Sequence, residues 1–256
     1  MSRIKILNVE IDNITQDELL AQLKRGVLVT PNVDQIVKMQ KDRDYYDIVR
    51  RAEWSVCDSQ ILYLCSKFLG NPLPEAIPGS SFFPAFCDYH KDDQNCKIFL
   101  LGAMDGVAKK AMERINSRIG RPIVVGAYSP SYGFEKNQEE NEEIYRMINS
   151  SGANVVLVGV GCPKQEKWID AHKAKMPGVD IWMALGATID FEAGNVKRAP
   201  MIWRNLYMEW FYRFLQEPRR MYKRYFVDDP IFFYHYLKQL LGLYKNPFEP
   251  KDNDQR

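Results

Sequence analysis

VVLVGVGCPKQEKW, from Val155 to Trp168, joins a run of apolar residues and glycines to a segment with helical composition. This order is typical of a buried strand, a tight loop and the start of a helix. The free N–H groups at a helix start suit an anion, and glycines let a phosphate approach the backbone. The segment therefore predicts an α/β unit that binds a phosphate-bearing ligand, although any strand-to-helix turn favours Gly and Pro. It is not the dinucleotide pattern G-x-G-x-x-G, because Lys164 stands where glycine is needed, and the full P-loop pattern is also missing.

The rest of the chain repeats this alternation of strand and helix. Strands are predicted at 5–12, 27–30, 54–57, 97–103, 123–127, 155–160 and 180–185. Helices are predicted at 15–23, 33–52, 59–70, 105–119, 138–148 and 163–176. Strands separated by helices indicate a Rossmann-like, mostly parallel sheet with helices on both faces.

Polar residues and glycines follow several of the predicted strands. In open parallel sheets, ligands bind beyond the carboxyl ends of the strands. A ligand site is therefore expected around a set of residues at or near those ends: Thr30, Asn32, Asp58, Gly102, Gly159, Gln165 and Asp190.

Composition excludes several protein classes. Hydrophobic residues make up 46% of the 256 residues and charged residues 27%, as in an ordinary globular protein. The five cysteines form no C-x-x-C pair and no signal peptide opens the chain, which favours a reducing cytosol. The three histidines show no ligand spacing with the cysteines, so no metal site is expected. No apolar run is long enough to span a membrane.

The composition changes after Pro200. Residues 201–244 hold 14 of the 32 aromatic residues, and Pro218 and Pro230 divide this segment into about three predicted helices. Residues 197–224 carry eight Lys and Arg against two Glu, a local charge of +6. Such an aromatic stripe is usually core, but with interleaved arginines it also suits an anionic bilayer surface or a lid over a diphosphate.

Several segments together resemble the WecG/TagA/CpsF glycosyltransferase family. They are TPNVDQIV, FLGNPLPEAIPGS, IFLLGA, VGVGCPKQEKWI, GATIDFEAGNVKRAP and EWFYRFLQEPRRMYKRY. The resemblance as a whole runs from about Lys5 to Tyr225. The resemblance implies an inverting transfer of N-acetylmannosamine, its uronic acid or a related hexose. It implies a UDP-sugar donor and a polyprenyl-diphosphate-linked sugar acceptor, in cell-surface polysaccharide synthesis such as that of teichoic acid or exopolysaccharide. No metal or other cofactor is implied.

The resemblance also implies roles for individual residues. Asp58 matches the family's proposed general base, which would take the proton from the acceptor hydroxyl; as an alternative, Asp58 could simply cap a helix. Thr30 and Gln165 are grouped with it as catalytic, and Asn32 would hold substrate hydroxyls. Asp190 is expected to bind the nucleotide rather than cap a helix.

Phosphate charge is expected to be met by arginines, because guanidinium groups match phosphate oxygens. The candidates are Arg213, Arg220 and Arg224, which could bind lipid headgroups instead. Further substrate contacts are expected at the strand-end loops, at Gly79, Gly102, Ala103, Gly159, Gly161, Pro163 and Lys164. Ala76 departs from the family pattern, which commonly has arginine there, so the sugar and the acceptor are left open.

The predicted organisation is a catalytic domain at 1–198, a helical membrane-associating appendage at 199–245 and a disordered tail at 246–256. The protein is expected to lie in the cytoplasm, on the anionic inner face of the membrane, without nucleic acid. Assembly into a homo-oligomer is left open. Two alternatives stay open: a nucleotide-dependent oxidoreductase or methyltransferase, and a non-catalytic peripheral membrane protein.

Overall fold

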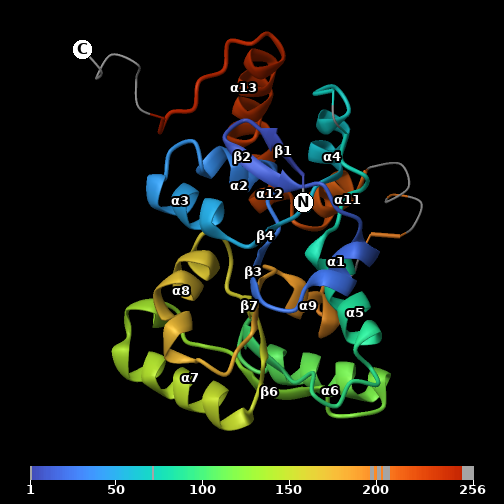
Figure 1. Cartoon of the computed structure of the whole chain (residues 1–256), viewed down its shortest axis with the longest axis vertical. Helices are drawn as coiled ribbons and strands as arrows, with labels where there is room; N and C mark the ends of the chain where they lie inside the picture. The colour runs from blue at the N-terminus through green and yellow to red at the C-terminus, as the bar shows by residue number, and fades with distance from the viewer. Residues whose placement is uncertain (1, 71, 197–198, 201–202, 204–207, 250–256) are drawn as a thin grey trace.

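The structure is a computed structural model that describes residues 2–70, 72–196, 199–200, 203 and 208–249. The side chains of Glu209, Arg213 and Arg220 lie outside this description. The chain forms an α/β fold around a central sheet, with the C-terminal helices at one end (Figure 1).

The central sheet has six strands, all parallel, in the order β4-β3-β8-β7-β5-β6. Their bounds are β3 Gly26–Val29, β4 Trp54–Ser55, β5 Ile98–Gly102, β6 Val124–Tyr128, β7 Val155–Gly159 and β8 Ile181–Ala184. The predicted parallel sheet is thereby confirmed. Because the strands are parallel, their carboxyl ends meet at one edge, where the predicted ligand residues lie.

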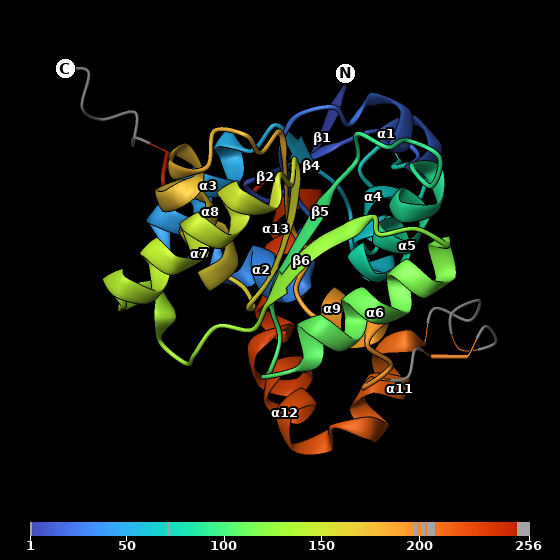
Figure 2. The same cartoon turned by 90° about the horizontal axis from the view of Figure 1, so that it is seen from below.

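Helices cover both faces of the sheet (Figure 2). The first face carries α2 Val33–Lys38, α3 Arg43–Arg51, α7 Gln138–Ser151, α8 Lys164–His172 and α13 Pro230–Leu240. The second face carries α1 Gln16–Gln22, α5 Gly79–Tyr89, α6 Val107–Ile119 and α9 Thr188–Glu192. The remaining elements are α4 Gln60–Ser66, α11 Glu209–Gln216, α12 Pro218–Tyr222, the π-helix η3 Lys223–Asp228, and the 3₁₀ turns η1 Phe134–Lys136 and η2 Lys173–Lys175.

Alternate residues of the buried strands supply the two cores. In β7, Val156 and Val158 pack into the core of the first face, whereas Val155 and Leu157 pack into that of the second. Side chains of a strand point to opposite faces in turn, so a strand buried on both faces is apolar throughout. This explains why the segment that begins at Val155 shows a continuous apolar run.

Two sequence predictions were wrong in detail, and two helices were missed. The single strand predicted at 5–12 is an antiparallel hairpin, β1 Arg3–Ile6 and β2 Val9–Asp12, which turns at Leu7 with a φ of 55°. The single helix predicted at 33–52 is α2 and α3, because the Asp42 carboxylate accepts a hydrogen bond from the Tyr45 N–H and starts a second helix. The helices α5 and α9 were not predicted.

The C-terminal helix α13 packs on the body that contains the sheet. Phe232 is fully buried in the core of the first face, and Tyr236 donates a hydrogen bond to the Cys65 carbonyl at 2.6 Å. The Gln239 side chain accepts from the Leu7 N–H at 2.8 Å and donates to the Lys5 carbonyl at 2.9 Å. Helix α13 is therefore held by both the core and the hairpin.

The chain beyond α13 also contacts the hairpin face. Of the tail predicted at 246–256, Asn246 donates to the Tyr46 hydroxyl and Glu249 pairs with Lys5; residues 250–256 lie outside the described residues. The predicted division at residue 198 stays a proposal. Among the described residues, no helix is both long and apolar enough to cross a bilayer.

Helix α8 buries two polar side chains at its start. Gln165 and Glu166 are each 1% exposed, and the Gln165 amide donates a hydrogen bond to the Glu166 carboxyl at 2.9 Å. Burial raises the pKa of Glu166 to about 7. A carboxyl group in this position costs stability when it is ionised.

Substitution of Phe232 tests whether α13 belongs to the core. Phe232→Ala is expected to lower the free energy of unfolding by about 3–5 kcal/mol, because it removes a buried aromatic ring. Phe233→Ala is the matched control: its ring is 49% exposed, so a change within about 0.5 kcal/mol is expected. Urea unfolding measures both, and equal small effects would mean that α13 contributes little to the core.

Substitution of Glu166 tests the buried carboxyl. The folded pKa of about 7 lies above the 4.5 of an exposed glutamate, so the folded protein holds a proton that the unfolded chain has lost between these values. Stability should therefore fall by about 3 kcal/mol as the pH rises from 4.5 through 7. Glu166→Gln should remove this dependence, whereas Glu142→Gln, at an exposed position of α7, should keep it. An unchanged pH profile of the unfolding free energy in Glu166→Gln would contradict the assignment.

Candidate active site

Three adjoining cavities follow the carboxyl edge of the sheet. We name them the outer, central and tail cavities, of about 590, 240 and 110 Å³. The outer and central cavities share the lining residues Gly161, Gly186 and Ala187. The central and tail cavities share Asn32, Asp58, Ser80 and Arg224. The shared lining residues place the three cavities side by side, from the loops after β5 and β7 to the C-terminal helices.

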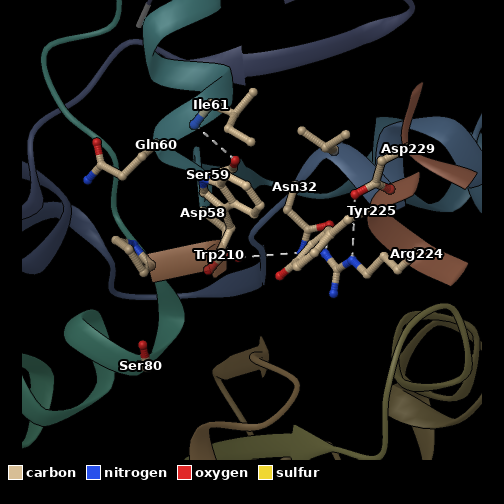
Figure 3. A pocket seen from close by; sticks show the side chains of 12 residues that line it. Asn32, Asp58, Ser59, Gln60, Ile61, Ser80, Trp210, Arg224, Tyr225 and Asp229 are labelled. Carbon is tan, nitrogen blue, oxygen red and sulfur yellow. Dashed lines mark hydrogen bonds and ion pairs between the residues drawn. The ribbon is translucent and has the colours of Figure 1, made fainter. Parts of the chain in front are cut away.

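Asp58 stands in the wall between the central and tail cavities (Figure 3). It follows β4, and it does not cap α4, because Ser59 is the N-cap and accepts from the Ile61 N–H. The Asp58 carboxylate instead accepts from the Gly79 N–H at 3.1 Å and from the Asn32 amide at 3.4 Å. Asp58 is therefore not the N-cap of α4, although it accepts the first N–H of α5, and its carboxylate is oriented by two donors.

Asn32 connects Asp58 to the C-terminal segment. Its side-chain oxygen caps α2 by accepting from the Gln35 N–H at 3.1 Å, and it also accepts from Arg224 Nη2 at 3.3 Å. Its amide nitrogen donates to Asp58. One amide therefore links a cap, a guanidinium group and a carboxylate, three groups from distant parts of the sequence.

Arg224 lies in η3, and its side chain lines the tail cavity (Figure 3). Its Nε is 3.8 Å from Asp229 Oδ2, and its guanidinium carbon is 5.7 Å from the centre of the Tyr225 ring. Tyr225 in turn meets Trp210 edge to face, with ring centres 5.8 Å apart. Burial raises the pKa of Asp229 to about 6, although Arg224 lowers it. These contacts hold a cation beside Asn32, on the same wall between the central and tail cavities that carries Asp58.

Thr30 and Gln165 line the central cavity, and both are at least 95% buried. The Gln165 side-chain oxygen accepts from the Gly186 N–H at 3.1 Å, while its nitrogen donates to Glu166 at 2.9 Å. Reversing the amide would break both bonds, so its orientation is set. The remaining N–H of this amide is a hydrogen-bond donor, which suits a substrate oxygen.

The outer cavity depends on a close approach of two strand ends. A Cβ atom at Gly102, whose φ is 142°, would lie 2.4 Å from the Gly159 carbonyl oxygen, so only glycine fits there. The next residue, Ala103, donates its N–H to that same carbonyl at 3.1 Å. The cavity is lined by Ala103, Gly159, Gly161, Lys164 and Asp190, all expected from the sequence.

The remaining predicted residues are placed as follows. Gly79 lines the central cavity and begins α5. Pro163 is the N-cap residue of α8, after a cis peptide bond. Asp190 lies in the first turn of α9, whose N-cap is Ala187, so it does not cap that helix. The side chains of Arg213 and Arg220 lie outside the described part of the chain, and these two predictions are not tested.

The cavities also have lining residues that sequence reasoning did not assign to the site, among them Tyr132, Trp210, Tyr225 and Asp229. Tyr132 lines the outer cavity, is fully exposed, and has the Lys164 ammonium 5.0 Å from its ring centre. It follows the carboxyl end of β6, a position that the rule for strand ends could have found. Trp210, Tyr225 and Asp229 line the tail cavity, and their segment offered only a dense run of aromatic residues.

Comparison with known proteins finds relatives and a family model that match nearly the whole chain. Two relatives from Staphylococcus aureus strains MW2 and MRSA252 are each 28% identical to this chain over 247 residues, covering 93% of both chains. Both are named N-acetylglucosaminyldiphosphoundecaprenol N-acetyl-beta-D-mannosaminyltransferase. The model of the glycosyl transferase WecG/TagA/CpsF family matches residues 4–246, nearly the whole length. With this match over the sheet, the three cavities and the C-terminal helices, the chain belongs to the WecG/TagA/CpsF family of glycosyl transferases.

Proposed function

We propose that this protein transfers N-acetylmannosamine or a related hexose from a UDP-sugar to a polyprenyl-diphosphate-linked N-acetylglucosamine, with inversion at the anomeric carbon. The relatives' names support the transferred sugar and the acceptor. The observation that carries the mechanism is the shared wall of the central and tail cavities. There a carboxylate, Asp58, and a guanidinium group, Arg224, are bridged by Asn32.

The donor nucleotide is proposed to occupy the outer cavity. Its volume of about 590 Å³ lies within the range of small-molecule sites. Asp190 could accept hydrogen bonds from ribose hydroxyls, and the exposed ring of Tyr132 offers a face to the base. The diphosphate would then lie near Gly161 and Lys164, at the start of α8, and the sugar would point into the central cavity.

The acceptor is proposed to enter through the tail cavity. Its attacking hydroxyl would lie beside Asp58, which takes the proton as the oxygen attacks the anomeric carbon. The bond from that carbon to the UDP oxygen breaks in the same step, so the configuration inverts. The Gly79 and Asn32 donors orient the Asp58 carboxylate, and Thr30 and Gln165, which also line the central cavity, hold sugar oxygens.

Departure of UDP leaves negative charge on the phosphate oxygens. A guanidinium group stabilises such charge better in a water-poor cavity than in solvent. Arg224 lines the central cavity together with Gly161, beside which the diphosphate is proposed to lie, and Arg213 and Arg220 stay proposals for the same role. The oxidoreductase and methyltransferase alternative loses support, because residues 4–246 match a glycosyl transferase family.

The C-terminal helices are proposed to lie on an anionic membrane surface, where the polyprenyl acceptor resides. They expose an unusual number of large apolar side chains: Leu215, Tyr222, Phe226, Val227, Phe233, Tyr234, Leu237, Leu240, Leu241 and Leu243. Exposed lysines at 223 and 245 accompany them. Apolar area combined with basic charge is what binds a peripheral helix to anionic lipid. Self-association stays an expectation.

Substitution of the proposed base tests the mechanism. Asp58→Asn should lower the rate of UDP release by about 10²–10⁴-fold, because the acceptor hydroxyl loses its base. Calorimetry should show UDP binding unchanged, since the outer cavity is intact. Asp44→Asn, at an exposed position of α3, is the control and should keep the rate. Unchanged turnover in Asp58→Asn would remove this residue from the mechanism.

Substitution of exposed leucines tests the membrane surface. Leu237 and Leu241 are 55% and 63% exposed and lie four residues apart, so they share one face. The double change Leu237→Glu with Leu241→Glu should lower binding to vesicles with anionic lipid about tenfold or more. Tyr89→Glu, at a 53% exposed position of α5, should bind as the parent protein does. Sedimentation with vesicles measures this, and equal binding of both variants would place the membrane contact elsewhere.

A further inference from the structure

Arg224 is held on two sides before any substrate is present. Its Nη2 contacts Asn32, and its Nε faces the carboxyl of Asp229 at 3.8 Å (Figure 3). The contact with Asn32 is long at 3.3 Å and shares its acceptor with the α2 cap. A phosphate oxygen could therefore replace Asn32 as the partner of Nη2 without uncapping α2.

Asp229 is buried for a carboxyl group. It is 7% exposed, it lines the tail cavity, and its Oδ1 has no hydrogen-bond partner among the described residues. Arg224 Nε is likewise buried without such a partner. The two groups attract each other as charges at 3.8 Å, but they do not complete a hydrogen bond. Burying this pair costs desolvation free energy, and a contact without a hydrogen bond recovers little of it. The pair therefore contributes little to the stability of the fold.

The backbone explains why these two residues face each other. The Asp229 N–H donates to the Arg224 carbonyl at 2.8 Å, a bond five residues long at the end of the π-helix η3. In an ordinary α-helix, residues five apart point in clearly different directions, whereas the wider π turn brings them closer to one side. The π turn thus aligns Asp229 with the guanidinium group.

The other charges around Asp229 come from two elements. Asp228 lies on η3, and Asp34 and Lys38 lie on α2, where they pair with each other at 2.8 Å. Burial raises the pKa of Asp229 to about 6, and Asp34 and Asp228 act in the same direction, while Arg224 and Lys38 oppose them. The Asp229 carboxyl is therefore mostly ionised at pH 7.5 and mostly neutral at pH 5.

We infer that Asp229 is a positioning residue that holds the Nε side of Arg224, so that its Nη atoms face the cavity and meet the oxygens of a substrate diphosphate. This inference rests on the proposed function and deepens it. A carboxylate on Nε leaves the forked edge of the guanidinium group for bidentate binding of phosphate. Asp229 itself touches no substrate and acts through Arg224.

A double-mutant cycle tests this role. The variants are Asp229→Asn, Arg224→Ala and their combination, with Asp228→Asn as the matched control, because it removes the same charge one residue away. Two readouts are taken at pH 7.5: kcat/KM for UDP release, and the affinity for inorganic diphosphate by calorimetry. Asp229→Asn should lower both about tenfold, and Asp228→Asn less than about twofold.

The combination decides between positioning and packing. If Asp229 acts through Arg224, then Asp229→Asn should change both readouts less than about twofold in the Arg224→Ala background. Equal effects in the two backgrounds would overturn the inference, as would an Asp229→Asn variant indistinguishable from Asp228→Asn. Thermal unfolding identifies a variant that has lost its fold, and Asp229→Glu, which restores a carboxyl group, should then recover part of the loss.

The pH dependence of kcat/KM is a measurement that a purely structural role of Asp229 would not change. As the pH falls through 6, the parent protein acquires a neutral Asp229, so the ratio of its kcat/KM to that of Asp229→Asn should fall from about ten towards one. Titration of other groups affects both proteins and cancels in this ratio. A ratio that stays constant from pH 7.5 to 5 would contradict the inference. If the parent protein releases no UDP, the proposed function is wrong. The diphosphate affinities of the four proteins in the double-mutant cycle still test the role of Asp229 in that case.

Discussion

The anchoring of α13 is the contact on which the candidate site depends. Asp58, Asn32 and Gln165 are placed by the sheet, but Arg224 and Asp229 reach them only because α13 continues from η3 and is fixed to the body. Phe232 enters the core of the first face, and Gln239 binds two backbone groups of the hairpin. The β1–β2 hairpin, remote from the cavities, therefore has a structural part in bringing the guanidinium group to the carboxylate.

A second constraint acts within the sheet. Gly102 and Gly159 are paired across β5 and β7, and a Cβ atom on Gly102 would collide with the Gly159 carbonyl. The close approach lets the chain turn away at Ala103 and leaves room for the outer cavity. Glycine at this point serves the shape of the cavity, beyond the usual need of a strand-to-helix loop.

Much of the sheet could be predicted from the sequence, because its signals are local. The apolar run from Val155 and the glycines that follow it indicate a buried strand and a loop, and the carboxyl-end rule places Thr30, Asn32, Asp58 and Gln165 together. The hairpin and the break between α2 and α3 were missed, because each depends on one residue, Leu7 with its positive φ and the cap Asp42. The tail side of the site could be predicted only in part. The sequence predicted Arg213, Arg220 and Arg224 as phosphate-binding candidates, but the partner of Arg224 is set by a π turn, which no local sequence pattern indicates.

Two buried carboxyl groups, those of Glu166 and Asp229, orient side chains of the site at a cost in stability, unlike the apolar residues of the core. Glu166 and Asp229 both have raised pKa values because burial disfavours their ionised forms, and each has one oxygen without a described hydrogen-bond partner. Apolar side chains of similar size would cost less free energy in these positions. What the carboxyl groups provide is orientation: Glu166 fixes the amide of Gln165, and Asp229 faces the Nε of Arg224. Each carboxyl group acts through a neighbouring side chain that lines the central cavity, Gln165 or Arg224. The directions of these two donor groups are therefore set before a substrate arrives. A preorganised donor loses less free energy to reorganisation than one that must first turn towards its ligand, and this favours transition-state stabilisation over stability of the fold.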